Sequence, residues 1–274
     1  MIGAAILGIG VWGPGLPGWA RAREVLAGRA PFVPDETAPP PPALLPPTER
    51  RRAGAATRLA LAVAVEASEM SGLAPGSVPG VFASSNGDGA VVGALLETLA
   101  SADPLVSPTQ FHNSVHNAAA GYWSIATGSA APVTSLSGHD GSLAAGLLRA
   151  VSEVVTDGAR VLLVVYDLPL PPPAAAVRPT RFAFGVGLAL GPAGTPGALA
   201  ELGLGHHAAP ADPDAEAPRM AALRELASAN PAARSLRLLE ALARGTADRS
   251  ALGLFGGHVA LEIRPCSAPG ASAR

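Results

Sequence analysis

The chain has 274 residues, enough for one large domain or two small ones with an ample core. Hydrophobic residues make up 49% of it and charged residues only 15%, which indicates a buried α/β interior rather than a disordered or fibrous chain. The formal net charge of −2 provides no positive surface for nucleic acid or an anionic membrane.

The first segment, MIGAAILGIGVWGPGLPGW, superficially resembles a signal peptide. It has no basic start, and Gly and Pro interrupt its apolar run, so we expect a buried strand over IGAAILGIGVW instead. No run approaches the ~18 apolar residues that a membrane span needs, and we expect a soluble, cytoplasmic protein. The single cysteine, Cys266, cannot form an intrachain disulfide, and we interpret it as a bystander near the C-terminus.

Predicted strands and helices alternate through the first 169 residues. The helix over 53–73 is apolar on nearly every side, which argues for burial. The strand over 159–169 is a continuous β-branched run, typical of a strand buried on both faces. The other predicted elements are a helix ending at Gly28, a proline-rich loop (32–47), a strand (79–86), a helix (89–101), an irregular polar segment (107–117), a helix (117–128), a strand (131–137) and a helix (141–158).

The remaining residues continue this alternation. We expect a second proline loop (169–180), a strand (181–192), a surface loop (205–218), two helices (219–229 and 232–244) and a turn into a final strand (253–265). Strands alternating with helices, several of them buried, argue for a layered α/β domain.

Ser137 is the sharpest candidate for chemistry. It lies in PVTSLSGHDGSLAAGLLRA, where a strand leads into an apolar helix, and a helix N-terminus can lower a nucleophile's pKa and stabilise an oxyanion. His139 and Asp140 follow at once, but side chains so close in sequence rarely face each other, which argues against a local triad. The first Gly of G-x-S-x-G is also missing. Asp140 is equally consistent with a cap on the helix that begins near Gly141.

The other histidines give weaker signals. His112 and His116 have the i, i+4 spacing of helical metal ligands, but their segment looks irregular and no third ligand is near. We therefore expect hydrogen-bonding histidines at an interface or pocket wall, and no metal. His206 and His207 indicate a solvated pair, whereas His258 either faces a pocket or merely starts a strand. GIGVWGPG is only loosely similar to a nucleotide-binding loop, so we expect no cofactor.

Several stretches form an ordered set that is more specific than any single motif. The opening AAILGIGVWGPGLPGWARAREVLAGRAP leads from a strand through glycines into a helix. FHNSVHNAAAGYWSIATG precedes the strand and helix around Ser137, and PGVFASSNGDG, ARVLLVVYDLP, FAFGVGLALGPA and GLFGGHVALEI complete the set. Together they resemble a β-ketoacyl synthase of the thiolase fold over most of the chain.

The resemblance implies an α/β protein with the layered, thiolase-like ketosynthase fold and a shortened second half. On this basis we expect a single ketosynthase-like domain over residues 1–274. Its N-terminal thiolase-like half would span 1–165, and its trimmed C-terminal half would span 166–274.

Three departures from the family pattern bear on function. The nucleophilic Cys of V-S-T-A-C falls on Ser137, which lacks the thiolate that makes Cys a ready nucleophile. The H-G-T-G-T and G-H-x-x-G settings of the two synthase histidines are missing between Pro192 and Leu252, where we expect only a loop and two helices. The closing G-L-F-G-G is one residue longer than G-F-G-G. The pattern resembles a chain length factor, a non-catalytic synthase-like subunit, of the aryl polyene and xanthomonadin pigment type.

This resemblance implies a heterodimer with a Cys-containing β-ketoacyl synthase, which the chain stabilises while it shapes the acyl tunnel. Acyl carrier protein would bind through the complex, with no catalytic residue, cofactor or metal in this chain. Tyr122 and Trp123 either pack beneath the tunnel wall or belong to the core. The implied tunnel and interface residues are Phe111, His112, Val115, His116 and Asn117, and the pocket candidates are Ser137, His139, Phe255, Gly256 and His258.

Two other hypotheses remain open. One is an acyltransferase or thioesterase that uses Ser137, with His139 or His258 as base, on chains bound to acyl carrier protein. The other is a degenerate homodimeric acyl-binding protein that needs only the fold.

Overall fold

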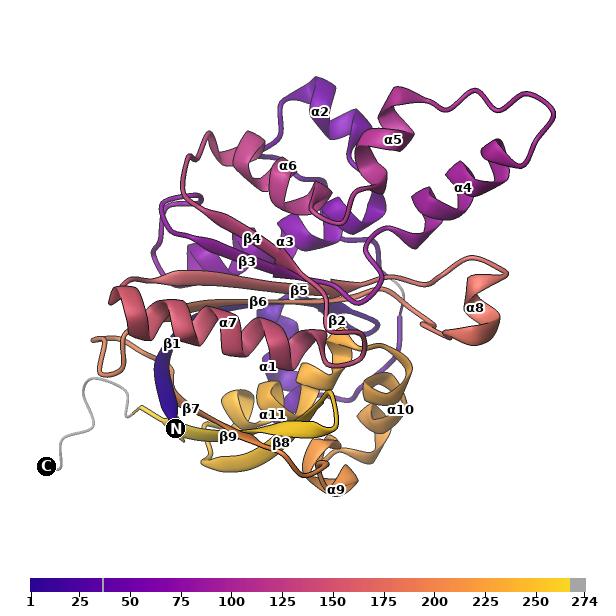
Figure 1. Cartoon of the computed structure of the whole chain (residues 1–274). Helices are drawn as coiled ribbons and strands as arrows, with labels where there is room; N and C mark the ends of the chain where they lie inside the picture. Colours follow the sequence, from indigo (N-terminus) through magenta and orange to yellow (C-terminus); the bar gives the residue numbers. More distant parts are fainter. Residues whose placement is uncertain (36, 267–274) are drawn as a thin grey trace, which may run out of the picture.

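The computed structural model describes residues 1–35 and 37–266. Within them, nine strands form one mixed sheet in the order β4-β3-β5-β6-β1-β7-β9-β8, with β2 paired to β1 (Figure 1). The strands are β1 (Ile2–Gly13), β2 (Leu16–Pro17), β3 (Gly80–Ala83), β4 (Val133–Leu136), β5 (Val161–Asp167), β6 (Phe184–Gly191), β7 (Ala200–His207), β8 (Asp248–Leu254) and β9 (Gly257–Pro265).

Strand β1 joins two sections of this sheet. In the first section β3 runs parallel to β4 and β5, while β6 is antiparallel to both β5 and β1. The second section, β7-β9-β8, is entirely antiparallel. The beginning of β1 pairs with β7 and the rest pairs with β6, so both sections share this one strand.

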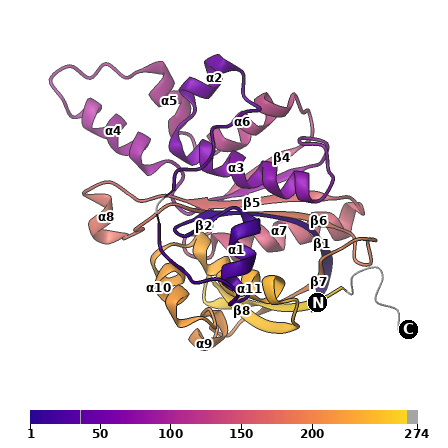
Figure 2. The same ribbon diagram turned by 180° about the vertical axis from the view of Figure 1, so that it is seen from behind.

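Helices cover both faces of the first section (Figures 1 and 2). Helices α3 and α6 lie on one face, with α2, α4 and α5 farther out, and α7, α1 and α11 lie on the other. The helices are α1 (Trp19–Leu26), α2 (Pro47–Arg52), α3 (Ala55–Met70), α4 (Gly89–Leu99), α5 (Pro108–Ser114), α6 (Ala118–Thr127), α7 (Ser142–Asp157), α8 (Ala174–Val177), α9 (Pro213–Glu216), α10 (Ala221–Ala229), the 3₁₀ turn η1 (Ala232–Ser235) and α11 (Leu236–Arg244).

Helix α3 is buried as its apolar sequence predicts, and glycines let it approach the sheet closely. A Cβ atom on Gly10 or Gly187 would lie 2.2 or 2.3 Å from the carbonyl oxygen of Val63. Any other residue at these two strand positions would push the helix away from the sheet.

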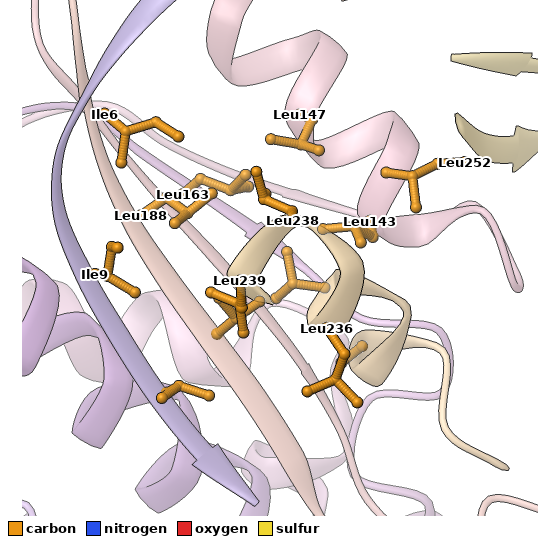
Figure 3. Packing of buried hydrophobic residues seen from close by; sticks show 14 of the residues in the cluster. Ile6, Ile9, Leu143, Leu147, Leu163, Leu188, Leu236, Leu238, Leu239 and Leu252 are labelled. Carbon is orange, nitrogen blue, oxygen red and sulfur yellow. The ribbon is translucent and has the colours of Figure 1, made fainter. Parts of the chain in front are cut away.

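The main core lies on the opposite face of the sheet. Leu147 of α7 and Leu238 and Leu239 of α11 pack toward Ile6, Leu163 and Leu188 of the strands (Figure 3). Helices α7 and α11 also contact β8 and β9, so these helices lie between the two sections of the sheet. The result is the layered α/β arrangement that the sequence predicts.

The second section is covered on one face only. Along β9, Val259, Leu261 and Ile263 are buried, whereas the alternate residues His258, Ala260 and Glu262 are partly exposed. This alternation is the pattern of an antiparallel sheet with one solvated face. It agrees with a shortened second half, in which no further layer of described residues covers this face.

The structure corrects several predicted elements. The segment 107–117 contains helix α5 rather than being irregular throughout. Helix α8 lies in the second predicted proline loop, and α2 begins at Pro47, the last residue of the first loop. The interval from Pro192 to Leu252 contains strand β7, helix α9 and most of strand β8 as well as the two expected helices. His206 and His207 therefore end a strand instead of opening a loop. No helix among the described residues has both the length and the apolar character needed to cross a membrane.

Candidate functional site

Ser137 lies on an exposed turn after β4, and α7 begins only at Ser142. Its hydroxyl donates a hydrogen bond to the carbonyl oxygen of Ser85 at 3.4 Å. Residues 138–141 separate Ser137 from the first helical turn, in agreement with the predicted helix start near Gly141. The helix dipole acts within its own first turn and gives Ser137 little activation.

Ser142 holds this turn together from within the protein. Its buried hydroxyl accepts a hydrogen bond from the N–H of Gly138 at 3.0 Å and donates one to the carbonyl of His139 at 2.7 Å. His139 adopts φ = 53°, the left-handed region that costs a non-glycine residue about 1–2 kcal/mol. The cap position is Gly141 with no side-chain hydrogen bond, so Asp140 does not cap α7.

Asp140 instead belongs to an arginine cluster that sequence inspection missed. Arg178, in the loop after α8, donates to Asp140 Oδ1 at 2.7 Å and to Asn86 Oδ1 at 2.6 Å, and also contacts Ser85. Arg234 of η1 donates to Asp140 Oδ2 at 3.4 Å. A lone arginine in a proline loop carries no local pattern, so only the tertiary structure reveals this cluster.

His139 takes part in the same cluster. Its Nε2 atom faces Nη1 of Arg178. A guanidinium only donates, so the histidine nitrogen must accept the hydrogen bond. The structure thus places His139 against Arg178 rather than against the Ser137 hydroxyl.

Asp167, at the end of β5, is a second residue that sequence inspection missed. It is fully buried, and its Oδ1 accepts hydrogen bonds from the Ser84 hydroxyl (3.1 Å) and from the N–H groups of Ser85 (2.8 Å) and Asn86 (3.2 Å). Its Oδ2 has no partner among the described residues. Burial raises the pKa of Asp167 to about 7. The available signal was a charged residue that ends an otherwise apolar strand.

The closing hairpin lies partly beside this site. A Cβ atom on Gly141 would meet the carbonyl oxygen of Gly253 at 3.0 Å, so the end of β8 touches the Ser137 turn. Phe255 and Gly256 form the hairpin tip with φ values of 39° and 82°, and Phe255 is 80% exposed. Positive φ at both positions is what tight hairpin turns require.

His258 lies on the solvated face of β9. Its Nδ1 donates to the carbonyl of Ala209 at 2.7 Å, and its ring stacks on His207 with centroids 4.9 Å apart. The structure therefore brings Ser137 and His139 into one neighbourhood and places His258 with His207 instead.

The side chains of the segment 111–117 lie on two sides: the histidines contact the protein, and the apolar residues face solvent. His112 meets Tyr122 edge-on with ring centroids 5.5 Å apart, and His116 Nε2 lies 3.0 Å from the carbonyl oxygen of Ser84. The two histidines thus contact different parts of the protein. Phe111 is 64% exposed, and Val115 is also exposed, so both point away from the fold.

Helix α6 completes this region. Tyr122 and Trp123 are both buried, and Trp123 packs against Phe82 of β3 in the core. Asn117 precedes the helix and is exposed. Asn117, Gly121 and Val133 help to line a groove of about 430 Å³ between α6 and β4.

A continuous surface extends from α4 to β4. Helix α4 is apolar yet has no buried residue, and it packs on α5, which contacts α6, which contacts β4. Among the described residues β4 pairs only with β3, so its other edge is open. We call this region the α4–β4 surface; it comprises the open edge of β4 and the exposed side chains of Val92, Leu96, Leu99, Phe111, Val115 and Ile125.

Known proteins place this fold in a family. The model of the β-ketoacyl synthase N-terminal domain matches residues 24–248. No curated protein sequence matches the chain significantly. The chain is similar to one chain of a ketosynthase (ApeO) in complex with its chain length factor (ApeC) from Xenorhabdus doucetiae, with TM-score 0.71, 20% identity, and 96% of this chain and 100% of that chain covered.

Two further structures relate the chain to ketosynthases of different lengths. The ishigamide ketosynthase/chain length factor matches with TM-score 0.71 and 16% identity over 97% of this chain and 100% of that chain. A ketosynthase from module 6 of the Bacillus subtilis bacillaene synthase matches with TM-score 0.55 and 14% identity, over 75% of this chain but only 41% of that chain. The predicted thiolase-like ketosynthase fold with a shortened second half is confirmed, and the chain belongs to the β-ketoacyl synthase N-terminal domain family.

Proposed function

We propose that this protein is a non-catalytic chain length factor that forms a heterodimer with a Cys-containing β-ketoacyl synthase. It would stabilise that subunit and shape the acyl tunnel during chain elongation of the fatty acid or polyketide type. Acyl carrier protein would be bound through the complex. The observation that carries the proposal is the α4–β4 surface, which exposes apolar side chains next to an unpaired sheet edge.

The α4–β4 surface has the two properties of a protein interface. Leu96 is 59% exposed and Phe111 is 64% exposed, on the neighbouring helices α4 and α5, and exposed apolar side chains gathered on neighbouring elements are typical of interaction sites. The open edge of β4 offers backbone donors and acceptors that a partner strand can pair with. The groove beside it is lined by Ala120, Gly121 and Ser124, whose small side chains allow close approach of a partner.

The Ser137 turn supports a non-catalytic role. A serine hydroxyl needs a base within hydrogen-bond reach to act as a nucleophile. The two histidines that the sequence offers are engaged elsewhere, His139 with Arg178 and His258 with Ala209. The Ser137-dependent acyltransferase or thioesterase therefore has no support from these contacts.

We further propose that the chain length factor is of the aryl polyene type, on the basis of one sequence segment. The segment FHNSVHNAAAGYWSIATG resembles chain length factors of aryl polyene and xanthomonadin pigment pathways, and it forms α5 and α6 of the α4–β4 surface. The similarity to a ketosynthase complex that contains a chain length factor supports the coarser proposal of a chain length factor, since it extends over the full length of the matched chain.

The test is native mass spectrometry of the tagged chain purified from the cells that make it. A one-to-one complex with a larger, Cys-containing ketosynthase is expected. A homodimer or monomer that carries no ketosynthase would contradict the proposal. An acyl adduct on Ser137 would instead support the enzyme hypothesis.

A further inference from the structure

A small polar cavity opens beside the Ser137 turn, and none of its lining residues belongs to the α4–β4 surface. It has a volume of about 290 Å³, close to the lower limit for small-molecule sites. Arg178 and Arg234 enter it from different parts of the chain, and Asp140 lies between them. His139, Thr180 and Asn230 are among the other lining residues.

The charges around this cavity do not balance. Arg178 and Arg234 have side chains only 20% and 27% exposed, yet they share one carboxylate, that of Asp140. His139 accepts a hydrogen bond from Arg178 and thus adds no negative charge. Asp167 lies behind the Ser85 loop, and its pKa is raised to about 7 by burial, so it is only partly ionised at neutral pH.

Hydrogen-bond donors remain available on the cavity wall. The bond to Asp140 at 3.4 Å is the only side-chain hydrogen bond of Arg234 among the described residues, whereas a guanidinium has five N–H groups. Thr180 is 5% exposed, and its hydroxyl oxygen accepts from Asn86 at 3.2 Å, which leaves its own proton to donate. These donors come from separate segments and converge on one space.

We infer that this cavity binds a small oxyanion of the phosphate or carboxylate type, held by Arg234, Arg178 and the Thr180 hydroxyl. Guanidinium groups bind such anions through paired N–H donors, and partial burial strengthens the interaction. Asp140 occupies the guanidinium groups when no ligand is bound and competes with the anion. The inference concerns the isolated chain and holds whether or not a ketosynthase binds the α4–β4 surface.

The experiment is isothermal titration of the full chain with inorganic phosphate and, separately, with malonate, at constant ionic strength so that screening does not change. We expect saturable one-site binding of at least one of them. Arg234→Gln should weaken that binding at least 10-fold. Asp140→Asn should tighten it several-fold, because it removes the competing carboxylate.

Arg181→Gln is the matched control. Arg181 is only three residues from Arg178, but it does not line the cavity and forms an exposed ion pair with Glu225 at 3.2 Å. It should leave the affinity unchanged. Tighter binding of phosphate would assign the ligand to the phosphate class, and tighter binding of malonate would assign it to the carboxylate class. Absence of saturable binding, an Arg234→Gln affinity equal to that of Arg181→Gln, or weaker binding by a folded Asp140→Asn variant would each overturn the inference; circular dichroism establishes that each variant is folded.

Discussion

The Ser137 region and the α4–β4 surface are built in opposite ways. Around Ser137, buried side chains such as Asp167 and Ser142 form hydrogen bonds with backbone groups of neighbouring loops, so contacts within the chain hold these loops in place. The α4–β4 surface leaves apolar side chains and a strand edge uncovered. The difference agrees with the proposed heterodimer, in which the partner subunit would cover the α4–β4 surface and leave the Ser137 region uncovered.

The largest effect on assembly of the complex is expected from a charge placed on the α4–β4 surface. Leu96→Glu should weaken the complex with the ketosynthase by at least about 2 kcal/mol, roughly 30-fold, because the carboxylate would be desolvated in an apolar contact. Pull-down and titration with the purified partner measure this. Val155→Glu is the control, since Val155 is a similarly exposed apolar residue on α7. Equal affinity of both variants would show that α4 is not at the interface.

Removal of the Asp167 carboxylate should destabilise the Ser137 region. Asp167→Ala leaves the Ser84 hydroxyl and the N–H groups of Ser85 and Asn86 without their acceptor. We expect a loss on the order of 3 kcal/mol in the free energy of unfolding, measured by urea denaturation at pH 5. Asp167→Asn keeps the accepting oxygen and should lose less. An Ala variant as stable as the Asn variant would contradict this network.

Asp167 should also make stability depend on pH. The raised pKa, about 7 against the usual 3.8, means that the folded state holds a proton that the unfolded state has released between these values. Stability should therefore fall as pH rises from about 4 to about 7, by up to about 1.4 kcal/mol per pH unit, and then level off. The measurement is the difference in unfolding free energy between wild type and Asp167→Asn from pH 5 to 8. A constant difference would contradict the raised pKa.

Chain length should respond to the exposed residues of α5 and the position after it. Phe111→Ala should lengthen the products of the reconstituted pair, because it enlarges the space that the side chain fills, and Val115→Trp should shorten them. Mass spectrometry of the released acyl chains measures the distribution. The control is Val155→Trp on α7. Unchanged product lengths in both the Phe111→Ala and the Val115→Trp variants would show that these residues do not line the tunnel.

The smallest effect is expected at Ser137 itself. Its hydrogen bond to Ser85 is long and exposed, so Ser137→Ala should change stability by less than about 0.5 kcal/mol. Product formation by the pair should stay within about twofold of wild type. Loss of all activity would contradict the non-catalytic role and support the Ser137-dependent enzyme hypothesis.

Sequence patterns predicted the parts of this fold that are encoded locally. Helix α3 and strand β5 have long apolar runs, and both lie where those runs indicate. Helix α5 escaped prediction because it is short and depends on a tertiary contact, in which Asn113 donates to the carbonyl of Arg52 at 2.8 Å. Strand β7 escaped because its glycines weaken the strand signal.

The site was less predictable than the fold. Ser137, His139 and Asp140 are adjacent in sequence and attracted attention as a group, yet their partners lie far along the chain. Arg178 and Arg234 reach Asp140 from segments that have no motif of their own. Asp167 acts through the loop after β3, which no spacing rule connects with β5. Such clusters arise from topology, and no local pattern specifies them.

The shared strand β1 has a consequence for how the molecule is made. It is synthesised before all the other described strands, yet its long-range partners are β6 (Phe184–Gly191) and β7 (Ala200–His207). During most of synthesis only the short pairing with β2 is available to it. Contacts so distant in sequence slow folding. The central strand of the sheet is therefore among the last to be completed, and the nascent chain must keep its apolar residues from aggregating until then.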